Sequence, residues 1–319
     1  MRLIDAQTTC AALPFDRLIP ALREMFIAGC EVPRRHVHEL QPGDPQGVTS
    51  LLMPAWQPSG CYGVKIVNIA PGNAARGLPG LHSSYLLHDA ATGAPLALID
   101  GDQITARRTA AASALAASYL ARDNARHLLV VGAGRVAALL PEAYRAVRAI
   151  DRVTVWSRQG AAAERLAEAW RHQGLAAEAA SDLGHAVAQA DIVSCATLAT
   201  EPLVSGRWLR PGSHLDLIGG FTPAMREADD DCFRGASIFI DTDEALAKSG
   251  DLLGPMARGV FAAGDVRARL DDLCRGAHPG RRDAAERTVF KSVGTGLEDL
   301  AAAMLAFGGA GDLPAGGLS

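Results

Sequence analysis

Residues 128–137 read Leu128-Leu-Val-Val-Gly-Ala-Gly-Arg-Val-Ala137, an apolar run that enters a glycine turn and continues into an alanine-rich segment. This pattern predicts a strand, a tight turn and the start of a helix, the arrangement that receives the pyrophosphate of a dinucleotide. A glycine permits the turn, a second lets backbone N–H groups approach phosphate, and the helix N-terminus favours the anion. We therefore expect a cofactor's phosphates to bind at Gly132, Gly134, Arg135 and Val136.

The segment that follows the turn alternates short apolar runs with helical patterns. Predicted strands cover residues 153–157, 191–196, 213–218 and 237–241, and predicted helices cover 161–173 and 183–190. Strands that alternate with helices predict a doubly wound parallel sheet. We expect five or six strands between residues 126 and 285, within a Rossmann domain of residues 123–287.

The first 120 residues predict a different architecture. Predicted strands cover residues 62–69, 83–88 and 95–100, the last two joined by a turn that makes them antiparallel. A long alanine-rich helix is expected over residues 105–121, and a last helix is expected to open at residue 289 and return to the first domain. The chain is therefore predicted to be an α/β protein in which an α+β domain, residues 1–122 with 288–319, flanks the Rossmann domain.

The composition predicts a soluble globular protein and argues against several classes of function. Hydrophobic residues make up 49% of the 319 residues and charged residues 21%. A net charge of −4 and an aromatic content of 5% argue against nucleic-acid binding. No stretch approaches the ~20 apolar residues of a membrane span, and the N-terminus lacks a signal peptide's apolar core. The six cysteines have no metal-ligand spacing, so we expect no metal, reduced thiols and a cytoplasmic protein.

The end of the second Rossmann strand selects between the two nicotinamide cofactors. An NAD site usually places an acidic residue there to bind the ribose 2′-hydroxyl. This chain has Ser157 and Arg158 instead, and an arginine can pair with a 2′-phosphate that a carboxylate would repel. We expect NADPH, with NADH possible; the alternative for Arg158 is an ordinary solvated arginine.

Several cations gather in the predicted first domain of this acidic protein. Lys65 lies in an otherwise apolar predicted strand, and a buried lysine needs an anionic partner, either a protein carboxylate or a substrate carboxylate. Arg108 lies one turn into the long helix, and Arg34 and Arg35 form another basic pair. Because arginine suits bidentate binding of carboxylates, the pattern indicates a small anionic substrate.

Further candidates follow from position in the predicted elements. His82 is a candidate proton donor, although a histidine that is merely hydrogen-bonded is the commoner case. Ligands of doubly wound sheets bind at the carboxyl ends of the strands. On that ground we assign Thr197 and Asp216 to the cofactor site. Gly219, which follows a predicted strand, and Thr109, which lies beside Arg108 in the long predicted helix, are assigned to the same site.

Short motifs occur along nearly the whole chain: Gly63-Val-Lys65, Asn73-Ala-Ala-Arg-Gly-Leu-Pro79, Asp100-Gly-Asp102, Arg108-Thr-Ala-Ala111, Gly132-Ala-Gly134 and Phe290-Lys-Ser-Val-Gly294. Together they resemble the ornithine cyclodeaminase/mu-crystallin family over roughly residues 15–305. The resemblance implies that Arg35, Lys65 and Arg108 hold the substrate carboxylate. Arg35 is preferred over its neighbour because the family arginine lies two residues after a proline. The resemblance also implies a homodimer joined through the substrate-binding first domain.

The residue that follows a Gly-Gly pair distinguishes branches of that family. Cyclodeaminases resemble one another in having an aspartate directly after a Gly-Gly pair, where it handles the substrate's amino group. Here Phe221 follows Gly219-Gly220, and a phenyl ring can neither accept a proton nor pair with an ammonium. The pattern Phe221-Thr-Pro-Ala-Met-Arg-Glu227 looks like the reductases of Δ1-pyrroline-2-carboxylate and Δ1-piperideine-2-carboxylate.

The resemblance therefore implies an NADPH-dependent ketimine reductase of proline metabolism that gives L-proline or L-pipecolate. Two alternatives stay open. One is an ornithine cyclodeaminase or another NAD(P)-dependent L-amino-acid dehydrogenase of the same family. The other is a non-catalytic, crystallin-like protein that binds NADPH.

Overall fold

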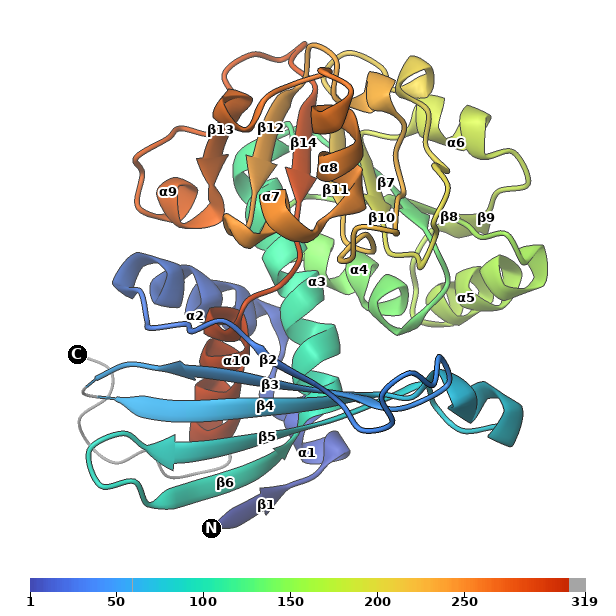
Figure 1. Ribbon diagram of the computed structural model, residues 1–319. Coiled ribbons are helices and arrows are strands. Elements are labelled where there is room, and N and C mark those ends of the chain that lie inside the picture. The colour runs from blue at the N-terminus through green and yellow to red at the C-terminus, as the bar shows by residue number, and fades with distance from the viewer. Residues whose placement is uncertain (59, 310–319) are drawn as a thin grey trace. The chain divides into compact units, whose positions relative to one another are not determined.

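The computed structural model describes residues 1–58 and 60–309 (Figure 1). The chain divides into two compact units, one formed by Met1–Arg108 with the C-terminal segment from Thr295, the other by Thr109–Gly294. We call them the first and the second unit. Residues 310–319, which were predicted to belong to the first domain, lie outside the described residues.

The second unit is built on an eight-stranded sheet in the order β13-β12-β14-β11-β10-β7-β8-β9, and every neighbouring pair is parallel. Its strands are β7 (His127–Val131), β8 (Arg152–Trp156), β9 (Ala177–Ala179), β10 (Ile192–Cys195), β11 (His214–Leu217), β12 (Ser237–Ile240), β13 (Val266–Arg269) and β14 (Thr288–Lys291). Its helices are α4 (Arg135–Arg145), α5 (Gly160–His172), α6 (Leu183–Gln189), α7 (Glu244–Lys248), α8 (Gly250–Ala257) and α9 (Leu270–Cys274). The predicted doubly wound Rossmann sheet is confirmed. The strand order reverses between β7 and β10, which is where such folds bind ligands.

The sheet is larger than the predicted five or six strands. Two short strands, β9 and β13, escaped prediction, and β14 corrects the prediction of a helix that opens at residue 289. β14 lies between β11 and β12, so residues 288–294 belong to the second unit and not to the first. A strand that is covered on both faces appears in the sequence as a short apolar run. Periodicity alone cannot distinguish such a run from a buried helical segment.

The first unit contains a six-stranded sheet in the order β1-β6-β5-β4-β3-β2, antiparallel except for the pair β1 and β6. Its strands are β1 (Arg2–Ile4), β2 (His36–Glu39), β3 (Thr49–Trp56), β4 (Cys61–Ile69), β5 (Leu81–Asp89) and β6 (Pro95–Asp100). Its helices are α1 (Ala6–Ala12), α2 (Phe15–Ala28) and α10 (Gly296–Gly309), and α10 packs against β3, β4, β5 and α2. Helix α3 (Gly101–Leu120) begins earlier than the predicted residue 105 and supplies residues to both units.

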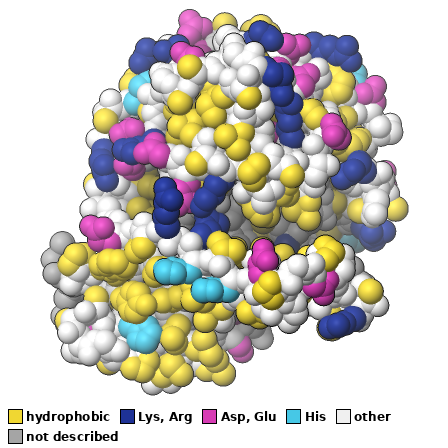
Figure 2. Space-filling view, viewed as in Figure 1, with side chains coloured by type: hydrophobic (Ala, Val, Ile, Leu, Met, Phe, Trp, Pro, Cys, Tyr) yellow, Lys and Arg dark blue, Asp and Glu magenta, His cyan; other side chains and the backbone are white. Residues whose placement is uncertain are grey.

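The two faces of this sheet differ. On the inner face, Gly63, Lys65 and Val67 of β4 are buried, whereas their neighbours along the strand are half exposed. The opposite face, here called the outer face, carries a row of directly paired apolar residues across five strands: Leu3, Leu98, Leu86, Val64 and Pro54. Figure 2 shows hydrophobic side chains and histidines gathered over the first unit. The alternation follows from the two-residue period of a strand.

Within the described residues, no helix is long and apolar enough to cross a membrane.

Candidate functional site

The glycine turn after β7 has the geometry that a dinucleotide requires. Gly132 has φ +120°, and a Cβ there would lie 2.5 Å from the carbonyl oxygen of Ala196, so only glycine fits. Gly134 caps the N-terminus of α4, and a Cβ there would meet no atom within 4 Å. The space beside Gly134 and the helix N-terminus therefore fit the pyrophosphate of a dinucleotide.

Thr109 lies within α3 and Asp216 within β11. The other predicted cofactor residues lie in this turn, at the start of α4 or directly after the carboxyl ends of strands. Arg135 and Val136 open α4, with Arg135 exposed. Ser157 and Arg158 follow β8, and Arg158 is exposed. The Ser157 hydroxyl donates to the carbonyl of Gln159 at 2.7 Å. Arg158, the predicted ligand of the 2′-phosphate, is therefore accessible to solvent near the end of β8.

Asp216, one of the predicted cofactor residues, is engaged in contacts within the second unit. It lies inside β11 with no exposed surface, and its carboxylate accepts hydrogen bonds from the hydroxyls of Ser113, Tyr144 and Ser194 at 3.2, 2.8 and 2.5 Å. Burial raises the pKa of Asp216 to about 6, against the opposing effect of the three hydroxyls. The carboxylate therefore joins α3, α4 and β10 to β11.

In the first unit, two of the predicted cations share one carboxylate. Lys65 Nζ lies 2.8 and 2.7 Å from the two carboxylate oxygens of Asp299, and Arg108 Nε lies 2.9 Å from Oδ1 of the same residue. Arg108 Nη1 also pairs with Glu298. The open question about the partner of Lys65 is thus answered by a protein carboxylate. Asp299 fixes both cations at one place on the inner face of the sheet.

The charges of this cluster are set by burial and pairing together. Burial lowers the pKa of Lys65 to about 8, although Asp299 opposes the shift, so the ammonium stays charged near neutral pH. Burial would raise the pKa of Asp299, but Lys65 and Arg108 hold it below its ordinary value. Two cations therefore face two carboxylates, and the cluster is close to neutral.

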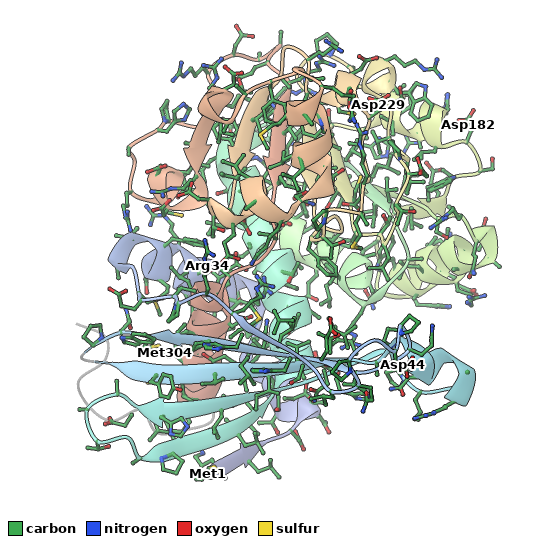
Figure 3. The ribbon with its side chains drawn as sticks, in the orientation of Figure 1. Met1, Arg34, Asp44, Asp182, Asp229 and Met304 are labelled. Atoms are coloured by element: carbon green, nitrogen blue, oxygen red, sulfur yellow. The ribbon has the colours of Figure 1, made fainter. Side chains whose placement is uncertain are left out.

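The two remaining basic candidates of the first unit lie in the segment that leads into β2. Arg35 directly precedes β2, and extending the pairing of β2 with β3 by one residue places it opposite Met53, which pairs with Lys65. Arg35 is thus two strands from Lys65, about 10 Å at the usual strand spacing. Arg34 is exposed in the same segment (Figure 3).

His82, the predicted proton donor, lies on a different face of the sheet from Lys65. Lys65 pairs directly with Tyr85 and Asn68 with His82, so the two positions differ by three along each strand, an odd number. Because side chains alternate between the faces of a strand, His82 lies on the outer face and Lys65 on the inner face. His82 is also exposed.

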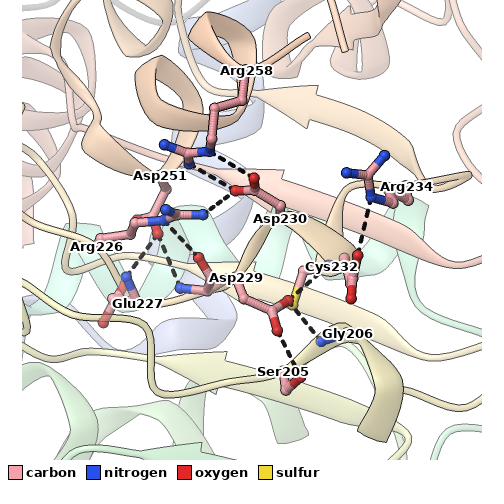
Figure 4. Close-up of polar contacts among 12 residues, drawn as sticks. Ser205, Gly206, Arg226, Glu227, Asp229, Asp230, Cys232, Arg234, Asp251 and Arg258 are labelled. Carbon is pink, nitrogen blue, oxygen red and sulfur yellow. Dashed lines mark hydrogen bonds and ion pairs between the residues drawn. The ribbon is translucent and has the colours of Figure 1, made fainter. Parts of the chain in front are cut away.

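The loop after β11 contains a set of ion pairs that sequence reasoning did not identify (Figure 4). Arg226 and Arg258 both bind Asp230, Arg258 through two hydrogen bonds of 2.7 and 2.8 Å. Asp251 accepts from the backbone N–H groups of Glu227 and Ala228 at 2.7 and 3.1 Å. These contacts anchor the loop that leads away from Gly219.

Sequence reasoning also missed the carboxylates that hold the cations. Glu298 and Asp299 are fully buried on α10, among leucines and alanines. Adjacent acids in a helix that is otherwise apolar were the available signal, because a buried carboxylate requires a partner. No group of three or more His, Cys, Asp or Glu side chains among the described residues could hold a metal ion.

The two glycines of the turn predict different mutational effects. Gly134→Ala should leave the stability of the ligand-free protein unchanged, because the new methyl group meets no atom. It should weaken NADPH binding about tenfold or more, because the methyl occupies the space for the pyrophosphate. Gly132→Ala should instead lower the melting temperature without ligand, through a strained φ and the contact with Ala196. Thermal unfolding with and without NADPH measures both; a Gly134→Ala variant that binds NADPH like the wild type would contradict this assignment.

Comparisons with known proteins agree with this geometry. The chain is 43% identical over 286 residues to the Δ1-pyrroline-2-carboxylate reductase of Paracoccus denitrificans, covering 88% of each chain. Its fold matches the Thermococcus litoralis Δ1-pyrroline-2-carboxylate reductase in complex with NADH and L-proline, with a TM-score of 0.91, 33% identity and 97% of each chain covered. It also matches an archaeal alanine dehydrogenase dimer with bound NAD, with a TM-score of 0.90, 28% identity, and 97% and 96% of the two chains covered.

The family model of the ornithine cyclodeaminase/mu-crystallin family matches residues 16–310, nearly the whole chain. With the glycine turn, the parallel sheet and these relatives, the match establishes that this chain is a member of the ornithine cyclodeaminase/mu-crystallin family.

Proposed function

We propose that this protein reduces cyclic ketimine carboxylates with NADPH, converting Δ1-pyrroline-2-carboxylate to L-proline and Δ1-piperideine-2-carboxylate to L-pipecolate. The observation that carries the proposal is the pair of cations, Lys65 and Arg108, that Asp299 fixes in place. The reductase names of relatives at 43% and 33% identity support the choice of substrate. Phe221 in place of an amine-handling aspartate favours a substrate whose nitrogen is already an imine.

The residues of the first unit bind and orient the substrate in this proposal. Arg108 would hold the substrate carboxylate, because a guanidinium offers five N–H donors and can bind more than one carboxylate. Lys65 adds a second positive charge, and Asp299 keeps both side chains in a single arrangement. Arg35 is the third proposed ligand. Fixing the carboxylate fixes C2 of the ring, which is the positioning contribution to catalysis.

The reaction balances with one hydride and one proton. Bound NADPH would supply the hydride to C2 and leave as NADP⁺. The hydride's electron pair forms the new C2–H bond, the C=N π bond breaks, and the π electron pair moves onto nitrogen. Nitrogen carries the proton of the iminium form, or takes one from Lys65 or water. We place the donor at Lys65 or water and not at His82, which lies on the other face of the sheet from Lys65.

The choice of NADPH over NADH rests on Arg158. The segment after β8 offers this exposed guanidinium and no carboxylate. A 2′-phosphate would gain a charge-assisted hydrogen bond there, and a 2′-hydroxyl would gain far less. The solved relatives named above carry NADH and NAD, so the preference of this chain is part of the proposal.

We also propose that two copies of the chain form a homodimer through the outer face of the first unit. The face is apolar in its central row, and Leu3 is 79% exposed. Exposed or half-exposed apolar residues on five adjacent strands form the kind of patch that marks an interface. The archaeal alanine dehydrogenase of the same fold is a dimer. A second copy, related by a twofold axis, would cover the row with the same row.

The activity test measures NADPH oxidation, by absorbance, with both cyclic imines. Arg108→Lys keeps the charge but loses the planar fork, so the KM for the imine should rise about tenfold while NADPH affinity stays within about twofold. Arg34→Ala is the matched control and should behave like the wild type. Turnover of ornithine or alanine without turnover of either imine would contradict the proposal in favour of a dehydrogenase or cyclodeaminase. Tight NADPH binding without any turnover would contradict it in favour of a binding protein.

The cofactor test uses Arg158→Ala. Loss of one charge-assisted contact should lower kcat/KM for NADPH about 10- to 100-fold and leave that for NADH nearly unchanged. Arg165→Ala, on the exposed side of α5, controls for a general loss of positive charge. Equal losses of kcat/KM with both cofactors would show that Arg158 does not bind the 2′-phosphate.

The dimer test places a charge in the apolar row. Val64→Asp should convert the dimer to a monomer, because the carboxylate would be buried without a partner between two apolar rows. Light scattering measures the mass, and circular dichroism checks that the variant is folded. A wild-type mass for the folded variant would place the interface elsewhere.

A further inference from the structure

Glu227 joins the ends of two neighbouring strands. Its Oε1 accepts from the backbone N–H and the hydroxyl of Thr197 at 2.7 and 2.8 Å, and its Oε2 accepts from the N–H of Gly219 at 2.7 Å. Thr197 follows β10 and Gly219 follows β11, and the two strands pair in parallel. One carboxylate therefore holds together two turns at the carboxyl edge of the sheet.

We call the three hydrogen bonds from Thr197 and Gly219 to Glu227 the tie. The residues that form it are closely packed and leave no room for other side chains. A Cβ at Gly219 would lie 1.9 Å from the carbonyl oxygen of Thr197 and 2.5 Å from Glu227 Oε1. Glu227 itself has no exposed surface, and its backbone N–H is fixed by Asp251. Burying a carboxylate is costly unless donors satisfy it, so this arrangement has to be maintained by specific contacts.

Each of the two joined turns carries an exposed apolar side chain. Leu198, directly after Thr197, is 74% exposed, and Phe221, two residues after Gly219, is 40% exposed. In a doubly wound sheet the carboxyl edge is where the ligand binds. Large apolar side chains exposed there have a physical reason if they contact a flat ring of the ligand.

From this geometry we infer that Glu227 is a positioning residue. It holds the turns after β10 and β11 so that Leu198 and Phe221 together form an apolar surface for the nicotinamide end of the cofactor. The inference rests on the proposed function for its reductase readout, but it concerns binding by the second unit alone. Glu227 itself touches neither cofactor nor substrate.

The tie depends on the ionisation of Glu227. Burial raises its pKa to about 7, with Asp251 acting in the same direction and Lys291 in the opposite one. The charged and titratable groups that face it are Asp251 from α8, Lys291 from β14 and the Cys195 thiol from β10. The ionised carboxylate accepts all three hydrogen bonds, whereas a protonated oxygen accepts less well. The tie is therefore strongest above pH 7 and weakens as the pH falls through that value.

Glu227→Gln tests the inference, because glutamine resembles the protonated acid at every pH. The ratio of wild-type to variant kcat/KM should be close to one near pH 6 and rise to about tenfold near pH 9. Glu201→Gln, an exposed position in the segment after β10, is the matched control and should show no change. A ratio that does not change with pH would overturn the inference, because a merely structural role predicts a uniform loss.

A binding measurement keeps the test independent of turnover. In Glu227→Gln near pH 9, NADPH affinity should fall about tenfold, while the affinity for 2′-phospho-ADP-ribose, which lacks nicotinamide, should stay within about twofold. Equal weakening of both ligands would overturn the inference. If the wild type turns over no imine but this difference is present, the proposed function fails and the positioning role stands.

A second variant covers the case in which Glu227→Gln does not fold. Thr197→Val removes one of the three donors, and Thr197→Ser retains it. The valine variant should show the same selective loss of NADPH affinity in reduced degree, and the serine variant should not. Equal behaviour of the two variants would count against the tie.

Discussion

Each fully buried lysine of the structure, and Arg108 with them, has a buried carboxylate partner, because an unpaired charge in apolar surroundings costs too much free energy to survive folding. Lys65 binds Asp299, Arg108 binds Asp299 and Glu298, and Lys291 lies 3.2 Å from Asp251. The pairs made by Lys65 and Arg108 connect β4 and α3 to α10. The pair of Lys291 and Asp251 supports the loop that contains Glu227.

The same constraint prepares the candidate site of the first unit for a ligand. A cation that is already paired does not rearrange when an anion arrives, so the loss of side-chain entropy is incurred on folding and not on binding. The pairing also keeps Lys65 protonated near neutral pH despite its burial. Asp299 is therefore as much a part of the proposed clamp as the cations themselves.

The second unit uses buried carboxylates in another way. Asp216 and Glu227 each accept three hydrogen bonds, but the donors are hydroxyls and N–H groups from different elements. Both carboxylates have raised pKa values because burial outweighs the donors. Asp216 joins elements within the core, whereas Glu227 acts at the edge of the sheet, next to the glycine turn.

The amino-acid sequence by itself determined the features that depend on neighbouring residues. The strand, the turn at Gly132 and the start of α4 follow from local backbone preferences, and the alternation of strands and helices then predicts the parallel sheet. The position of β14 inside that sheet, the face on which His82 lies and the partners of Lys65 and Arg108 were decided by the tertiary structure. The physical reason is that register and pairing join residues that are far apart in the chain, as Lys65 and Asp299 are. The roles of the apolar run of β14, of His82 and of the acidic pair Glu298–Asp299 therefore depend on which strands and helices pack together in the folded protein.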